Sequence, residues 1–169
     1  MSAATSPRAH LPLPLLVLTC ARDFEGLTEQ GDNSGPGVNW LQSRAGIPDG
    51  APWCAAFVNA AAELACALQD RPSPLEHVPQ QGLVQSYVEH GTGRGWIVED
   101  DDAAAGDLFA LLFPGGEYHH IGLVERPPRE SHFTTLEGNT NEEGKREGRK
   151  VMSRTRRVTG GVLFLRPWA

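Results

Sequence analysis

A cysteine opens an apolar segment with helical spacing, APWCAAFVNAAAELACAL (residues 51–68). Pro52 suits the first turn of a helix, so Cys54 is expected at a helix N-terminus. The partial positive charge and unpaired N–H groups of such a terminus stabilise a thiolate, the nucleophilic form of cysteine. Cys66 lies at the far end of the same segment and Cys20 in a separate one. Of the three cysteines, only Cys54 is therefore placed to act as a nucleophile, with its own N–H near a developing oxyanion.

A nucleophilic cysteine needs a base, and the predicted hairpin HIGLVERPPRESHFTTLEGN (residues 120–139) contains one. If residues 127–130 form a four-residue loop, His120 lies directly opposite Glu137 on the paired strand. A carboxylate beside an imidazole fixes its tautomer and stabilises its charged form. Asn139 shares the same face as a diagonal neighbour. The sequence thus predicts that a base, a carboxylate and an amide lie together.

Each of these residues also has a purely structural interpretation. Cysteine is common in protein cores, and a carboxylate taken alone is usually solvated. The register also matters, because a loop one residue longer or shorter would turn Glu137 to the other face. His119 and His132 fall on other faces or at strand ends. The combination of a helix-terminal Cys54 with His120 opposite Glu137 is what favours catalysis.

The composition bounds the class of protein. A length of 169 residues favours one domain with a sizeable core. A hydrophobic fraction of 40% and a charged fraction of 21% are typical of globular chains, and the net charge of −6 argues against a dedicated nucleic-acid-binding protein. The three cysteines include no CxxC motif, so they indicate neither a disulfide scaffold nor a typical zinc site. No segment approaches the roughly 18 apolar residues of a membrane span.

The N-terminal region resembles an export signal only weakly. The run LPLPLLVLTCARD (residues 11–23) is short and contains two prolines, and Thr19 is larger than the residue that normally precedes a lipid-bearing cysteine. Residues 1–12 are expected to form a flexible tail, and residues 13–169 a single domain. The chain is expected to be cytoplasmic as synthesised.

Helical and strand patterns occupy different halves of the chain. Helices are expected over residues 15–24, 38–44, 52–68 and 80–90, with Gly91 as the cap of the last. Short runs rich in β-favouring residues follow at residues 107–113, 120–125, 132–138 and 161–166. Helices followed by strands predict an α+β fold, with the helices packed on a mainly antiparallel sheet.

The same residues carry a family resemblance. In order along the chain stand PWCAAFV (52–58), GD (106–107), HHIGLV (119–124) and LEGNTN (136–141). Their order and spacing resemble the CHAP family of papain-like cysteine amidases and peptidases. The upstream segment LTEQGDNSGPGV (27–38) is similar to the one that precedes the cysteine in a phage and bacterial branch of that family. The resemblance extends over about residues 15–167.

This resemblance implies a papain-like fold and a cysteine-dependent amide hydrolase. Cys54 would be the nucleophile and His120 the base, with Glu137 orienting His120 and Asn139 supporting it. Family members typically cut amide bonds of peptidoglycan as cell-wall hydrolases of the endolysin kind, either as amidases between the sugar lactyl group and the stem peptide or as endopeptidases. Many carry Gln immediately before the cysteine, where this chain has Trp53, so the second oxyanion donor is unassigned.

Further expectations concern the substrate and partners. Trp53, Trp96 and Tyr118 are candidate walls of a substrate groove, and each is equally plausible as a core residue. The acidic run EDDDAAAGD (99–107) lacks the spaced ligands of a calcium loop, so no metal or other cofactor is expected. The expected partner is peptidoglycan or another amide substrate, reached after release or delivery from the cell. A cognate immunity protein is expected only if the chain is a delivered toxin, and the protein itself is expected to be a monomer.

Three other interpretations remain open. An NlpC-type cell-wall peptidase shares the fold plan, but it usually has DCSG around its cysteine and a second histidine in place of Glu137. A zinc protein would use His119, His120 and His132 with a cysteine, although adjacent strand histidines point to opposite faces. A non-catalytic binding module would present the basic stretch KREGRKVMSRTRR (145–157) to an anionic polymer, unless that stretch is the solvated edge of a strand pair.

Overall fold

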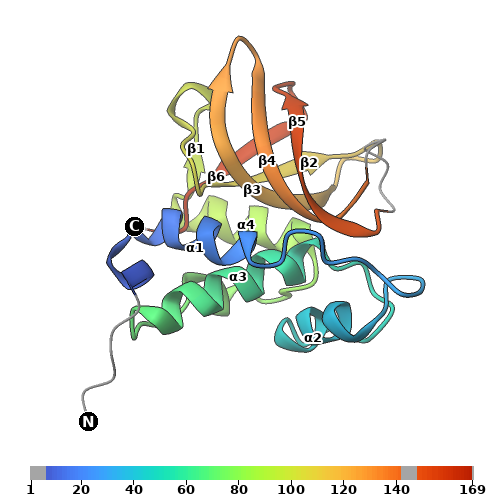
Figure 1. Ribbon diagram of the computed structural model, residues 1–169. Coiled ribbons are helices and arrows are strands. Elements are labelled where there is room, and N and C mark those ends of the chain that lie inside the picture. Colours follow the sequence, from blue (N-terminus) through green and yellow to red (C-terminus); the bar gives the residue numbers. More distant parts are fainter. Residues whose placement is uncertain (1–6, 142–147, 169) are drawn as a thin grey trace.

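The computed structural model describes residues 7–141 and 148–168. Within these residues the chain forms four α-helices and one six-stranded antiparallel sheet. The helices gather along one side of the sheet, with α3 and α4 against strand β3 (Figure 1). The expected α+β class, with helices packed on an antiparallel sheet, is therefore confirmed.

The central helix is α3, which contacts the sheet as well as helices α1 and α2. Most of its side chains are buried, and many of them are alanines that allow close packing on several sides. The α-helices are α1 (Leu13–Arg22), α2 (Pro36–Arg44), α3 (Cys54–Leu68) and α4 (Val84–Arg94). Three short 3-10 helices are η1 (Pro7–His10), η2 (Pro74–His77) and η3 (Asp100–Asp102).

The sheet has the strand order β1-β6-β2-β3-β4-β5. Its strands are β1 (Ile97–Val98), β2 (Leu108–Leu112), β3 (Tyr118–Arg129), β4 (His132–Thr140), β5 (Lys150–Arg157) and β6 (Val162–Leu165). Strand β5 is an edge strand, as expected if the basic stretch is a solvated strand edge; residues 145–147 of that stretch lie outside the described residues. The short strand β1 has no counterpart in the sequence prediction.

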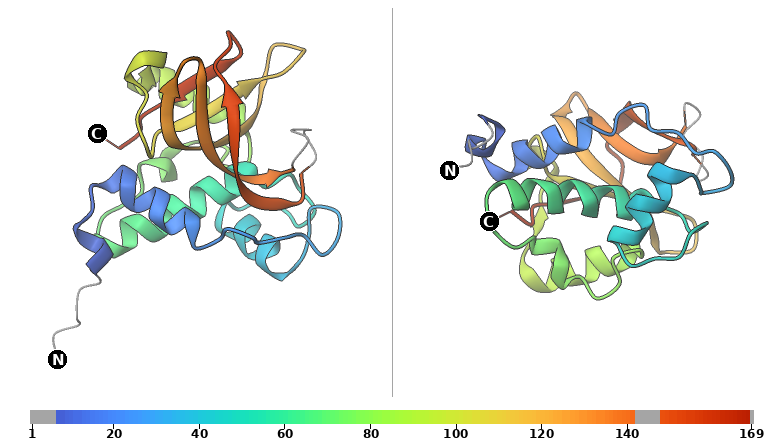
Figure 2. Two further views of the ribbon diagram at one scale, coloured as in Figure 1. Left: turned by 45° about the horizontal axis from the view of Figure 1, so that its top comes forward. Right: turned by 60° about the horizontal axis from the view of Figure 1, so that its bottom comes forward.

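The sheet is strongly curved, and this curvature creates a second core away from the helices (Figures 1 and 2). Phe133 of β4 and Phe164 of β6 lie with ring centroids 5.1 Å apart, although two strands separate β4 from β6. Phe109 of β2 completes the aromatic cluster at 5.5 Å from Phe133. The concave face of the sheet is therefore closed over its own side chains, whereas the other face packs on the helices.

The last helix differs most from the prediction. Gly91 was expected as its cap, but it lies inside α4, and the cap is Gly95 with a left-handed φ of 72°. A Cβ atom at Gly91 would lie 2.7 Å from Leu165 Cδ2 and 3.1 Å from the Trp96 ring. Gly91 therefore allows close packing between α4 and the sheet. From the sequence alone, a glycine near the end of a helical pattern indicates a helix cap instead.

The β3–β4 hairpin differs from the predicted one in its turn and register. The predicted four-residue loop over 127–130 is wrong, because β3 continues to Arg129, which pairs with His132. Glu130 and Ser131 form a two-residue turn in which both have positive φ, 49° and 64°. Two irregularities along the hairpin shift the register, so that Leu123 pairs with Leu136 next to the site.

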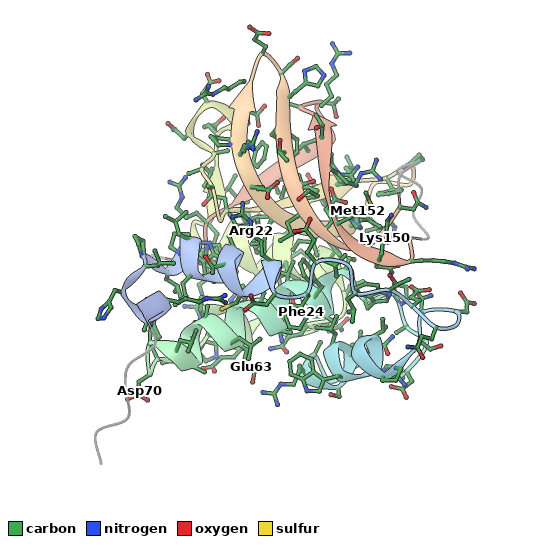
Figure 3. The ribbon with its side chains drawn as sticks, in the orientation of Figure 1. Arg22, Phe24, Glu63, Asp70, Lys150 and Met152 are labelled. Carbon is green, nitrogen blue, oxygen red and sulfur yellow. The ribbon has the colours of Figure 1, made fainter. Side chains whose placement is uncertain are left out.

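The segments that flank α1 are held against the rest of the fold. Pro7–His10, within the expected tail, forms η1 on α3, and Gln69 donates to the carbonyl groups of Ala9 and Leu11. After α1 the backbone of Leu27 bonds to Val151 of β5, on the side of the molecule where Figure 3 shows Phe24, Lys150 and Met152. Within residues 7–141 and 148–168, every helix is too short or too polar to cross a membrane.

Candidate active site

Cys54 is the first residue of α3, and the loop before it is fixed by α2. The Gln42 side chain is fully buried and donates to the carbonyl oxygens of Ala51 at 2.7 Å and Asn33 at 2.9 Å. A buried amide that bonds two backbone carbonyls ties the loops on either side of α2 together. The position of Cys54 is therefore set by residues well upstream of the apolar segment.

Trp53 caps α3 on its N-terminal side and has no exposed surface. Its indole N–H donates to the carboxylate of Glu29 at 2.7 Å, and the other oxygen of Glu29 accepts from the backbone N–H of Asn33. The segment 27–38 thus acts as scaffolding for the start of α3. Trp53, which the sequence left open as a groove wall or a core residue, is a core residue.

A close approach between α3 and β4 brings the cysteine to the sheet. A Cβ atom at Gly138 would lie 2.6 Å from Phe57 Cβ and 2.9 Å from the Trp53 ring, so only glycine fits there. Gly138 stands between Glu137 and Asn139. The missing side chain therefore lets the first turn of α3 lie directly on the part of β4 that carries both predicted site residues.

His120 and Glu137 meet as the sequence predicted, although through a different register. His120 Nε2 lies 2.8 Å from Glu137 Oε2, and both side chains are buried. Continuing the Leu123–Leu136 pairing sets Gly122 opposite Glu137, so His120 is a diagonal neighbour rather than a direct one. The register differs from the predicted one by two residues, and an even shift keeps both side chains on the same face.

Glu137 has further partners that the sequence analysis missed. Arg156 of β5 donates from Nε to Oε1 and from Nη2 to Oε2, each at 2.5 Å. The Thr135 hydroxyl donates to Oε1 at 2.5 Å. An arginine that bonds a carboxylate through both of its fork nitrogens holds it in a fixed plane. The alternating pattern of β5 could have indicated that Arg156 faces the concave side, but from the sequence this stretch was interpreted only as a binding surface or a solvated strand edge.

The thiol of Cys54 lies in a buried environment with compensating partners. Burial raises the pKa of this thiol, but the His120 ring and the N–H groups of Ile121 and Ala55 outweigh that effect, so the net pKa is lowered. The pKa values of Cys20 and Cys66 are raised instead, chiefly by burial. This difference matches the sequence argument that only Cys54 is placed for activation.

The pKa values of His120 and Glu137 shift in the directions that favour their charged forms. Burial lowers the pKa of His120, but its interactions with Cys54 and Glu137 outweigh burial and raise it to about 9. Burial raises the pKa of Glu137, but Arg156 and His120 outweigh burial and hold it well below its usual range. These shifts favour the thiolate of Cys54, the imidazolium of His120 and the carboxylate of Glu137 over their uncharged forms.

Asn139 lies beside the same site but bonds to other groups than His120. Its side-chain oxygen accepts from the backbone N–H of Trp53 at 3.1 Å, and its side-chain nitrogen donates to the Gly148 carbonyl at 2.5 Å. Its own backbone has a φ of 52°, in the left-handed region that asparagine tolerates better than most residues. Asn139 therefore anchors the start of α3 to β4, which supports the Cys54–His120 geometry indirectly.

A cavity of about 560 Å³ opens over Cys54, His120 and Asn139. Its walls come mainly from two loops, 45–52 before α3 and 79–84 before α4, together with His119. Trp53, Trp96 and Tyr118 do not line it. Trp96 instead packs edge-on against His90, and the backbone N–H of Tyr118 donates to Gln85 Oε1 at 3.1 Å. The sequence did not predict that these two loops form the cavity walls, because their prolines and glycines indicate only turns.

Two further histidines, His119 in the cavity wall and His132 at the hairpin turn, have their ring contacts away from Cys54 and Glu137. His119 turns away from His120 toward Glu117, at 3.6 Å, and Phe113. His132 stands at the hairpin turn, with Nδ1 at 3.1 Å from the Glu130 carbonyl oxygen. Among the described residues, no group of three or more His, Cys, Asp and Glu side chains is arranged to hold a metal ion.

The comparisons with known proteins add information on the fold alone. No family model matches the sequence, and no curated protein matches it. Among solved structures, the crystal structure of Ly7917 is similar, with a TM-score of 0.52 and 16% sequence identity. The similarity covers 90% of this chain and 61% of the Ly7917 chain, so this chain corresponds to less than two thirds of that protein.

Proposed function

We propose that this protein is a cysteine-dependent amide hydrolase with a papain-like arrangement of its site, and that its substrate is peptidoglycan. The observation that carries the proposal is the buried contact of His120 with Glu137 beside a helix-terminal Cys54 of lowered pKa, at the floor of an open cavity. A structural core cysteine has no need of these partners. The choice of peptidoglycan rests on the resemblance of the sequence motifs to the CHAP family.

The first half of the reaction forms a thioester. The Cys54 thiolate attacks the amide carbonyl carbon, and the carbonyl oxygen becomes an oxyanion. The N–H of Cys54 is in the first turn of α3, where N–H groups lack intrahelical partners, and it donates to that oxyanion. The His120 imidazolium then donates its proton to the amide nitrogen, the C–N bond breaks, and the amine leaves.

The second half releases the acid. A water molecule gives a proton to the now neutral His120 and attacks the thioester carbon. The C–S bond breaks and restores the thiolate beside the imidazolium. Glu137 stays ionised throughout and keeps Nε2 of His120 as a donor, so that the other ring nitrogen serves Cys54.

The lining of the cavity suits an uncharged stretch of substrate. Among the described residues, the only ionisable side chains in its lining are Cys54, His119 and His120, and prolines, glycines and aliphatic residues dominate the walls. Peptidoglycan stem peptides contain runs of small residues linked by amide bonds. An NlpC-type peptidase is the weaker alternative, because a carboxylate rather than a second histidine bonds His120.

The test is digestion of purified peptidoglycan sacculi by the wild type, Cys54→Ala and Cys66→Ala. Cys66 is also a buried cysteine of α3, so Cys66→Ala is the matched control. We expect soluble fragments from the wild type and Cys66→Ala only, with masses that separate an amidase from an endopeptidase. Release by Cys54→Ala, or binding of sacculi without release by all three proteins, would overturn the catalytic proposal and favour a binding module.

A further inference from the structure

Four ionisable side chains from four different elements form one continuous cluster, of which three are buried and one, Arg156, is partly exposed. Cys54 comes from α3, His120 from β3, Glu137 from β4 and Arg156 from β5. The reaction described above uses the first three. Arg156 is the member that the reaction leaves without a part, and its side chain is only 16% exposed.

Arg156 is built into the cluster rather than placed near it. Its guanidinium bonds both oxygens of Glu137 and also lies over the Phe109 ring, 5.7 Å from the ring centroid. Each Glu137 oxygen thereby accepts two hydrogen bonds, one from Arg156 and one from Thr135 or His120. The carboxylate has one fixed orientation, and that orientation decides where His120 points.

The charges of the cluster explain why a second cation is needed. In the reactive form Cys54 and Glu137 are both anions, and both are buried. His120 as an imidazolium balances only one of them. Without Arg156, formation of the thiolate would leave an excess negative charge in a site with little solvent, which is strongly unfavourable.

We propose that Arg156 is a positioning residue of the Cys54 site, which holds Glu137 in one orientation and supplies the second positive charge that allows a buried carboxylate and a buried thiolate to exist together. The proposal deepens the proposed function, since it concerns the same site. Two other ionisable groups lie near the cluster. Arg154 of β5 interacts electrostatically with Arg156 and Glu137, and Tyr87 of α4 interacts with Cys54. Among the described residues, Arg156 is the one that bonds both oxygens of Glu137.

The test measures the reactivity of the Cys54 thiol directly and needs no substrate. The rate of iodoacetamide alkylation at Cys54, located by peptide mass mapping, is recorded against pH for the full-length wild type, Arg156→Met, Arg156→Lys and Arg157→Met. Arg157→Met is the matched control, because Arg157 is the next residue of β5, is exposed and faces the opposite way. We expect the midpoint of thiolate formation to rise in Arg156→Met, but by less than the roughly 1–3 pH units of a directly paired charge, because Arg156 acts on Cys54 through Glu137 and His120.

Arg156→Lys keeps the positive charge, so its midpoint of thiolate formation should lie close to that of the wild type. It loses one of the two hydrogen bonds to Glu137, so its peptidoglycan hydrolysis should recover less fully. Arg157→Met should match the wild type in both. An unchanged midpoint in Arg156→Met, even with a lowered melting temperature, would show a purely structural ion pair and overturn the proposal. Failure of the proposed function would look different: the midpoint would shift as expected, but no variant would hydrolyse peptidoglycan.

The paired variant Glu137→Gln/Arg156→Met covers the case in which Arg156→Met does not fold. It removes both charges of a buried pair together, so it avoids an unpaired buried carboxylate. In that case Arg156→Gln replaces Arg156→Met as the single variant. We expect the midpoint of thiolate formation in the paired variant to lie closer to that of the wild type than the midpoint in the single variant that folds. A midpoint equally displaced in the paired variant would contradict the charge argument.

Discussion

Gly122 of β3 lies against the side chain of Glu137 on β4. A Cβ atom at Gly122 would stand 3.1 Å from Glu137 Cγ and 2.7 Å from Phe109 Cε1. Both contacts are tighter than packed side chains normally allow. The empty position at residue 122 therefore leaves the room in which Glu137 reaches diagonally to His120.

Gly122→Ala should displace Glu137 or Phe109 and weaken the His120–Glu137 bond. We expect a loss of stability of about 1–3 kcal/mol, as for other overpacked core positions, and a fall in hydrolytic activity beyond that explained by unfolding. Urea denaturation and activity at a temperature where the variant is folded measure the two effects. Gly93→Ala is the control, because nothing lies within 4 Å of its Cβ position in α4 and alanine favours a helix. Full activity in folded Gly122→Ala would contradict the prediction.

The pH dependence of hydrolysis should follow the two shifted groups. Activity requires the imidazolium of His120, whose pKa is about 9, so the rate should fall as the pH rises through about 9. On the acid side the rate should fall only below the ordinary thiol range, because the pKa of Cys54 is lowered. Initial rates between pH 4 and about 11 test both limits against the normal thiol pKa of about 8.5.

The pH at which activity falls on the alkaline side should decrease when Glu137 is replaced by a neutral residue. Glu137 raises the pKa of His120, so Glu137→Gln should bring the alkaline fall of any residual activity to lower pH. An alkaline limit that stays in place, in a variant that remains folded, would mean that His120 does not set it.

Asn139 combines an unusual backbone conformation with an anchoring side chain, and two substitutions separate these features. Asn139→Gly accepts the φ of 52° and loses the bond to the Trp53 N–H, whereas Asn139→Ala also strains the backbone. We expect Asn139→Gly to lose about 1 kcal/mol of stability, like the loss of a helix cap, and Asn139→Ala to lose more. Thermal unfolding gives the order of the two, and Asn139→Ala at least as stable as Asn139→Gly would contradict it.

The two loops that wall the cavity touch each other at Gly82 and Ile47. A Cβ atom at Gly82 would overlap Ile47 Cγ2, so Gly82→Ala must move Ile47 and reshape the cavity. We expect Gly82→Ala to change KM or kcat for hydrolysis while the alkylation rate of Cys54 stays that of the wild type. Ile47→Ala/Gly82→Ala should recover activity, because it removes the overlapping side chain. An equal loss of alkylation in Gly82→Ala would place the damage at Cys54 instead.

The sequence predicted the helix-terminal Cys54 and the His120–Glu137 contact because both depend on robust local rules. A proline before an apolar run marks a helix start, and strand side chains alternate between faces. The hairpin loop was predicted wrongly, but the resulting register error was two residues and so preserved the face.

Other parts of the site depend on long-range contacts that no local pattern reports. The basic stretch containing Arg156 resembles a solvated edge, and its sequence does not indicate that it pairs with β4 and that Arg156 bonds Glu137. The cavity walls are likewise loops whose sequences indicate turns but not what those turns face. Trp53 was equally compatible with a wall and a core position, and its bond to Glu29 from a distant segment decided between them.

The wide separation of the four cluster residues along the chain also bears on when the thiol becomes reactive. Contacts between distant segments form late in folding, since the loops between them must close first. During synthesis Cys54 emerges long before β5, and until β5 joins the sheet it is an ordinary thiol without its two cations nearby. We therefore expect the Cys54 thiol of the nascent chain to react no faster than an ordinary thiol, with the more reactive thiolate appearing only when the edge of the sheet is complete. The rate at which alkylation accelerates during refolding would then report the last step of assembly.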